Sequence, residues 1–260
     1  MAGAISKFVA QLSPAAEALI FMSTIQWRKG RFPALLTRVI GALGQRLLEP
    51  VSALTHLAGA VGAATGLLIL LYVTRQDQPK MVSLAVYGVS MVTLFATSTL
   101  FHGIKLPEVR RMWLNRLDHV AIFLLIAGTY TPIIHNLYPK GYRWPLLAAI
   151  WLAAIIGIIY KMFGRRIHGL INASVYPVMA WAGVIPTLIL YQAKPFMPIE
   201  GGLLLLCGGL IYMVGFVIYY RKWPNPWPNI FGHHEIWHLF VLGGSFCHFL
   251  FMLLFVALRS

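Results

Sequence analysis

The sequence predicts an all-α, polytopic membrane protein that folds as a bundle of seven transmembrane helices. The chain has 260 residues, of which 59% are hydrophobic and only 11% are charged, and its mean hydropathy is +0.74. A soluble domain of average composition carries roughly 25% charged residues. This composition excludes an ordinary soluble globular enzyme, a disordered chain and a disulfide-stapled secreted chain.

The apolar residues form runs that are each long enough to cross a bilayer, which takes about 20 helical residues. Short charged or Pro-bearing segments, such as RKWPNPWPN at 221–229, separate these runs. Alternation typical of strands is not sustained anywhere in the sequence. The expected spans are 51–73, 81–104, 117–137, 144–162, 168–191, 201–220 and 235–257.

Residues 1–48 differ from the rest of the chain. We expect residues 49–258 to form the membrane domain. The stretch from Phe8 to Ile25 is interrupted by Gln11, Pro14 and Glu17, so it makes a poor span and a poor signal peptide. We expect an interfacial helix there, with a hydrophobic first helix as the alternative. The basic segment that follows contains Arg28, Lys29, Arg31, Arg38 and Arg46.

The basic residues predict the orientation of the chain in its membrane. The net charge is +14. The N-terminal segment and every second loop after it, which lie on one side of the membrane, carry 15 of the 21 Lys and Arg residues. The loops on the other side and the C-terminus carry 6. The positive-inside rule then places the N-terminus in the cytoplasm and the C-terminus outside. Because these charges flank apolar runs, they indicate contact with membrane lipids and not with nucleic acid. The expected location is a cell membrane.

Unusual polar residues occur at the same, cytoplasmic end of four expected spans. An ionisable side chain within a span costs about 2.5–3.5 kcal/mol on insertion scales, so each one is a candidate functional residue. Cys207 and Cys247 lie within apolar runs and offer neither a disulfide framework nor a CxxC zinc motif. The polar residues that converge are Glu49, His56, Ser98, His102, Asp118, His119, His233, His234, Glu235 and His238.

Their spacing favours a metal site. His234 and His238 are four residues apart, so both imidazoles project from one face of a helix. Ser98 and His102 repeat this spacing with a hydroxyl group in the first position. Three histidines, His102, His234 and His238, with one open position are typical of catalytic zinc. Asp118 is then available to orient a water molecule or to act as its general base.

Other polar residues near this end have more than one interpretation. Glu235 resembles the base of an HExxH motif, although the soluble context of that motif is absent. Glu49 precedes Pro50 and either caps the first span or supports the metal ligands. His56 is an interface residue or, with Glu49 and Glu235, part of the shell around the ligands. His248 lies about 15 Å along the helix from His238, so we expect a buried hydrogen bond there instead of a shared ion.

Four ordered motifs resemble the hemolysin III family, which is related to the progestin and adiponectin receptors and to the alkaline ceramidases. The motifs are Glu49-Pro50 with Ser52-Ala53-Leu54-Thr55-His56, Ser98-Thr99-Leu100-Phe101-His102, Arg116-Leu117-Asp118-His119, and His234-Glu235-Ile236-Trp237-His238. The resemblance covers about 45–258. It implies a seven-span fold with zinc near the cytoplasmic face, held by His102, His234 and His238, with Ser98 and Asp118 at the site.

Three functions are compatible with these residues. The first is a zinc-dependent hydrolase of a lipid amide or ester, in which Asp118 takes a proton from water and Ser98 binds the oxyanion or Asp118. The second is a non-enzymatic membrane-homeostasis or receptor-like protein with structural zinc. The third, a pore-forming cytolysin, ranks last because the sequence shows no amphipathic pore segment. The sequence names neither the lipid nor the oligomeric state.

The charge count yields a prediction about topology. Cysteines introduced into 105–116 and 221–230 should react with a membrane-impermeant thiol reagent only from the cytoplasmic side, because both segments belong to the basic set. A cysteine introduced after Val256 should react from outside. Labelling of both loops from the external face would contradict the predicted orientation.

Overall fold

The computed structural model describes residues 34–164, 169–193, 196–228 and 230–259, and within these ranges the fold is helical with one isolated β-bridge, between Trp227 and Phe231. The interfacial helix expected within the first 26 residues lies outside the described residues, whereas Arg38 and Arg46 lie on a short helix, α3. The elements are α3 (Ala34–Arg46), α4 (Pro50–Val73), α5 (Gln78–Gly103), α6 (Glu108–Leu137), α7 (Lys140–Phe163), α8 (Gly169–Ala182), α9 (Val184–Ala193), α10 (Ile199–Arg221), α11 (His233–Phe251) and a π-helical turn (Met252–Ala257).

Seven helical segments among the described residues are long and apolar enough to cross a membrane, which confirms the predicted fold class. One predicted boundary is wrong by nine residues, because α6 begins at Glu108 and not near residue 117. The first turns of α6 are charged, so apolar periodicity did not mark them, but backbone hydrogen bonding extends the helix regardless of polarity. Asp118 therefore lies ten residues, or about 15 Å, into this helix.

The fifth span is broken into α8 and α9 at Gly183. Pro186 has no N–H to donate to the carbonyl of Ala182, and its ring crowds that carbonyl, so the first helix ends there. The missing side chain at Gly183 also makes room for Tyr130 of α6, since a Cβ atom would lie 2.5 Å from its Cζ atom. The Tyr130 hydroxyl donates to the carbonyl of Ala180 at 2.6 Å, which joins α6 to the broken span.

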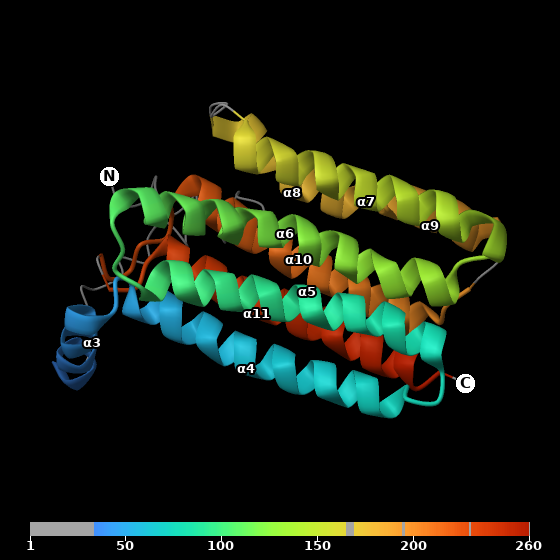
Figure 1. Cartoon of the computed structure of the whole chain (residues 1–260), viewed down its shortest axis with the longest axis horizontal. Helices are drawn as coiled ribbons and strands as arrows, with labels where there is room; N and C mark the ends of the chain where they lie inside the picture. Colours follow the sequence, from blue (N-terminus) through green and yellow to red (C-terminus); the bar gives the residue numbers. More distant parts are fainter. Residues whose placement is uncertain (1–33, 165–168, 194–195, 229, 260) are drawn as a thin grey trace, which may run out of the picture.

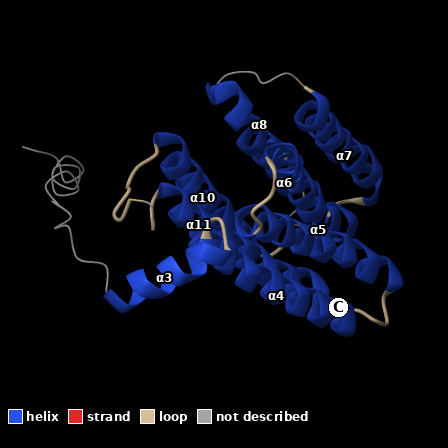
Figure 2. Cartoon of the chain, turned by 60° about the vertical axis from the view of Figure 1, so that its left-hand side comes forward, coloured by secondary structure: helices blue, strands red, loops and turns tan. Residues whose placement is uncertain are grey.

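The helices form a tightly packed part and a looser part (Figures 1 and 2). Helices α4, α5, α6 and α11 enclose most of the buried side chains, including Leu70, Tyr87, Phe95 and Phe251. Within this group, α6 is the helix that lies next to the pair formed by α7 and the α8–α9 span (Figure 1). The starts of α4, α6 and α11 and the end of α5 meet at the end of the bundle where α3 lies (Figure 1). The predicted polar end of four helices is therefore one place in the structure.

The close packing of α5 against α6 predicts the effect of a single methyl group. A Cβ atom at Gly128 would lie 2.8 Å from the Cβ atom of Ser90, which is fixed to the backbone of α5. We expect Gly128→Ala to destabilise the protein by roughly 1–3 kcal/mol, seen as a lower melting temperature in detergent. Gly62→Ala is the matched control, because nothing lies within 4 Å of its Cβ position. Equal melting temperatures for the two variants would contradict this account of the packing.

Candidate metal centre

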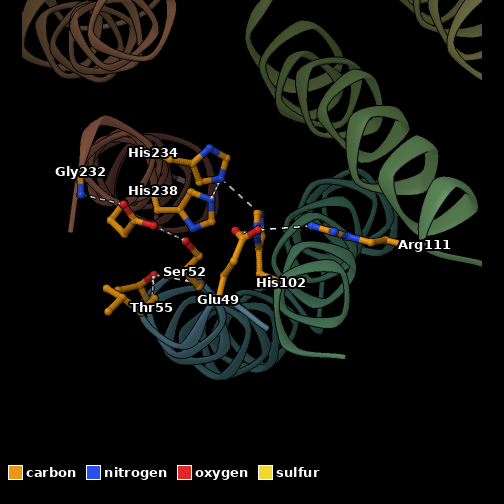
Figure 3. A network of polar contacts seen from close by, with 10 residues as sticks. Glu49, Ser52, Thr55, His102, Arg111, Gly232, His234 and His238 are labelled. Carbon is orange, nitrogen blue, oxygen red and sulfur yellow. Dashed lines mark hydrogen bonds and ion pairs between the residues drawn. The ribbon is translucent and has the colours of Figure 1, made fainter. Parts of the chain in front are cut away.

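Three histidines from two helices converge at the polar end of the bundle (Figure 3). His102 lies in the last turn of α5, and His234 and His238 lie on consecutive turns at the start of α11. The Nε2 atom of His234 is 3.4 Å from that of His102 and 3.1 Å from that of His238. One ring nitrogen from each residue lies within 4.8 Å of the others, and His102 and His238 are both only 2% exposed. This buried group could hold a metal ion.

The arrangement of the three nitrogens fits a zinc ion. Zinc binds imidazole nitrogen at about 2.0–2.1 Å in tetrahedral geometry, so two such nitrogens lie about 3.3 Å apart. The two measured separations bracket that value. Neutral imidazoles suit zinc, copper, iron and nickel alike. The donors and the two separations that involve His234 are therefore compatible with the predicted zinc and also with these other metals.

Glu49 orients the first of these histidines. Its Oε2 atom accepts a hydrogen bond from Nδ1 of His102 at 2.6 Å, which leaves Nε2 of that ring free to face the other two. The backbone N–H of Glu49 donates to the carbonyl of His102 at 2.8 Å, and Arg111 donates to Oε1 at 3.4 Å. The hydrogen bond with His102 lowers the pKa of the Glu49 carboxyl group. As for the two interpretations of Glu49, its side chain makes no capping bond to α4 and instead contacts His102.

Glu235 stabilises the start of the helix that carries the other two histidines. Its Oε2 atom accepts a hydrogen bond from the backbone N–H of Gly232 at 2.7 Å, as in a capping box. Its Oε1 atom accepts from the hydroxyl of Ser52 on α4 at 3.0 Å. The carboxylate thus ties α11 to α4 and fixes the first turn of α11, which carries His234.

His56 on α4 packs directly against a proposed ligand. Its ring stacks on that of His238 with 3.7 Å between centroids, and the edge of Phe95 approaches at 5.1 Å. Neither ring nitrogen of His56 has a hydrogen-bond partner among the described residues, and the side chain is buried. The contact restricts rotation of the His238 ring.

Ser98 and Asp118 lie near the histidines but outside the group of three. Ser98 is one turn before His102 on α5 and is 3% exposed. Its hydroxyl group interacts with the carboxyl group of Asp118 on α6. Both residues line the cavity that also contains the three histidines. The two side chains singled out for chemistry therefore face the same space as the candidate metal centre.

This cavity is large and mostly apolar. Its volume is about 1360 Å³, and it extends from the histidines between α6 and the later helices α8, α9, α10 and α11. Its walls include Leu188 on α9 and Leu203 on α10, whose side chains are 57% and 59% exposed. The cavity wall formed by α9 and α10 therefore includes apolar side chains that are not covered by other parts of the described chain.

The remaining histidines have other contacts. His248 donates to the carbonyl of Leu205 at 3.3 Å, which confirms the buried hydrogen bond expected for it. The Nδ1 atom of His119 lies 2.7 Å from the carbonyl oxygen of Asn115 on the same helix. His135 lies near the other end of α6. The sequence did not predict the contact of Ser52 with Glu235 or that of Arg111 with Glu49. No spacing along the chain connects the residues of either pair.

The fold and the site together define a class, a seven-helix integral membrane protein with a buried three-histidine group at one end of the bundle. A family model described as Haemolysin-III related matches residues 45–249, so the chain belongs to that family. The resemblance seen in the sequence motifs is thereby confirmed, as is a multi-pass membrane location.

Relatives of known name cover most of the chain. It is 39% identical over 210 residues to "Hemolysin-3" of Bacillus cereus, a match that spans 80% of this chain and 91% of that protein. "Hemolysin-3 homolog" of Bacillus subtilis (strain 168) is 36% identical over 216 residues, or 81% and 95% of the two chains. "Monocyte to macrophage differentiation factor" of Homo sapiens is 29% identical over 189 residues, or 69% and 73%.

The geometry predicts which histidines retain metal. Purified protein should contain about one zinc ion per chain, and His102→Ala, His234→Ala or His238→Ala should each remove most of it, because two imidazoles bind zinc far more weakly than three. His135→Ala, at the opposite end of α6, is the control and should keep the metal. The measurement is metal content by mass spectrometry. Full zinc in the His234 and His238 variants would exclude the site.

Proposed function

We propose that this protein is a zinc-dependent hydrolase that cleaves an amide or ester bond of a lipid near the cytoplasmic leaflet. The observation that carries the proposal is the position of the three-histidine group on the wall of a large apolar cavity. A structural metal site needs no such cavity. A catalytic site must admit a substrate, and the exposed wall residues of α9 and α10 offer a route from the bilayer.

The residues around the histidines support hydrolysis. A bound zinc ion would supply an activated water molecule and polarise the substrate carbonyl group. Asp118 accepts the proton that the attacking water loses and returns it to the leaving amine or alcohol. The Ser98 hydroxyl orients that carboxylate or donates a hydrogen bond to the developing oxyanion. Glu49 holds His102 in the tautomer that presents Nε2 to the metal.

The apolar cavity supports a lipid as the substrate. Pockets for drug-sized ligands usually have volumes of about 300–1,000 Å³. The cavity here exceeds that range, and its wall is formed largely by Leu, Ile, Val, Met and aromatic side chains. Such a surface favours an acyl chain over a polar metabolite, because burial of each CH₂ group is favourable by about 0.8 kcal/mol.

The alternative is a non-enzymatic membrane-homeostasis or receptor-like role with structural zinc. One observation favours it: the histidines join α5 to α11, and Glu49 adds the start of α4, so a bound ion would fasten α11 to two helices from the first half of the chain. A pore-forming role ranks below both, since it rests on the name of the relatives and not on a feature of the described residues.

Substitution of Asp118 separates the two leading functions. For a hydrolase, Asp118→Asn should retain zinc, because the three imidazoles remain, and should lower lipid hydrolysis by about 10²–10⁴-fold through loss of the general base. Zinc content, melting temperature and turnover of ceramide and phospholipid in detergent are measured together. Glu108→Gln on the same helix is the control, because Glu108 lies in the exposed first turn of α6.

The outcomes distinguish the proposals clearly. Wild-type protein that turns over no lipid amide or ester, together with an Asp118→Asn variant that only melts earlier or loses metal, would contradict the hydrolase and favour the structural role. Loss of turnover in Asp118→Asn with zinc and melting temperature unchanged supports the hydrolase.

A further inference from the structure

Two basic side chains line the polar end of the cavity without a carboxylate partner. Arg116 on α6 and Lys161 on α7 line the same cavity as Ser98 and Asp118. The ion pairs between described residues within 4.0 Å involve only Asp77 and Glu49 as the acids. The whole chain has 7 Asp and Glu against 21 Lys and Arg, so few acids are available to neutralise these two cations.

Neutral groups hold both cations in place. The Nη1 atom of Arg116 donates to the carbonyl of Met162, the residue that follows Lys161. The Nζ atom of Lys161 donates to the backbone and side-chain carbonyls of Asn172 on α8, at 3.1 and 2.5 Å. The same atom lies 4.8 Å from the centre of the Tyr176 ring. These contacts place both cations where α6, α7 and α8 meet, with Arg116 bonded to the residue next to Lys161.

The contacts leave donors available. A guanidinium group has five N–H donors and an ammonium group has three. One donor of Arg116 and two of Lys161 are used by the protein. Both residues can therefore donate to a ligand while they keep their present positions.

The cations are also partly removed from water. Burial of a charge is costly unless a group of opposite charge accompanies it, and all the partners present here are neutral. Arg110, on the same helix and at the same end of the bundle, is exposed and can contact lipid headgroups directly. Lys161 instead turns to Asn172 and Tyr176 at the cavity, so contact with bulk headgroups does not account for its position.

We propose that Arg116 and Lys161 form an anion-binding site for the phosphate or carboxylate headgroup of a lipid whose acyl chain occupies the apolar part of the cavity. Such a headgroup supplies the missing negative charge and accepts charge-assisted hydrogen bonds from both residues. The same lipid is the substrate only if the proposed hydrolase function holds, whereas its binding does not depend on catalysis.

Binding is tested with the full-length, zinc-loaded protein in neutral detergent. The probes are 1-oleoyl lysophosphatidate, the neutral lipid 1-oleoylglycerol and inorganic phosphate, and the readout is the rise in melting temperature across a titration. We expect lysophosphatidate to bind at least about tenfold more tightly than 1-oleoylglycerol, as two charge-assisted hydrogen bonds imply. Equal affinity for the two lipids would overturn the proposal, and equal protection by inorganic phosphate would overturn the assignment to a lipid.

Variants assign the effect to the two residues. Arg116→Gln and Lys161→Gln should each lose about tenfold or more of the preference for lysophosphatidate, whereas Lys161→Arg should keep it. Arg110→Gln removes the same charge from the same helix and should bind as the wild type does. If Arg110→Gln weakens binding as much as Arg116→Gln, the effect is general surface attraction and the site is wrong. Lipid turnover is measured separately, so a failed hydrolase proposal leaves the binding result intact.

Discussion

The contact between Glu49 and His102 fixes the geometry on which the rest of the site depends. One carboxylate oxygen accepts from the imidazole while the backbone N–H of the same residue donates to the carbonyl of His102, so the start of α4 and the end of α5 are joined twice. The ring nitrogen that remains faces His234, and Glu235 holds the start of α11 against α4 through Ser52. Three helix ends therefore reach a common position before any metal is considered.

Four carboxylates among the described residues occupy positions where helices need negative charge. Asp77 caps α5 by accepting from the N–H of Lys80, and Glu235 caps α11. Glu108 and Glu200 lie in the first turns of α6 and α10, where the helix dipole favours an acid. Among the described residues, Glu49 and Asp118 line the cavity. Arg116 and Lys161 line it too and form no ion pair with a described residue, so the cavity offers charged groups of both signs to a ligand.

The two parts of the bundle have different physical roles. Helices α4, α5, α6 and α11 pack closely, with small residues such as Gly128 at their contacts, and α5 and α11 bring the three histidines together, with His234 3.4 and 3.1 Å from the other two. The α8–α9 span is interrupted at Gly183, and it lies across the cavity from that rigid group. The closely packed helices therefore hold the polar side chains, and the cavity lies between α6 and α11 on one side and the less buried later helices on the other.

The sequence by itself determined the fold class, six of the seven spans closely, and the three histidines, because apolar length and the spacing of His234 and His238 are local properties of the chain. It did not determine where α6 begins, since charged residues continue a helix beyond its apolar part. The role of Glu49, the stacking of His56 on His238 and the pairing of Arg116 with the segment around Lys161 were decided only by the tertiary structure. Each of these contacts joins residues of different helices, and the distance between such residues is set by how the helices pack and not by any interval along the sequence.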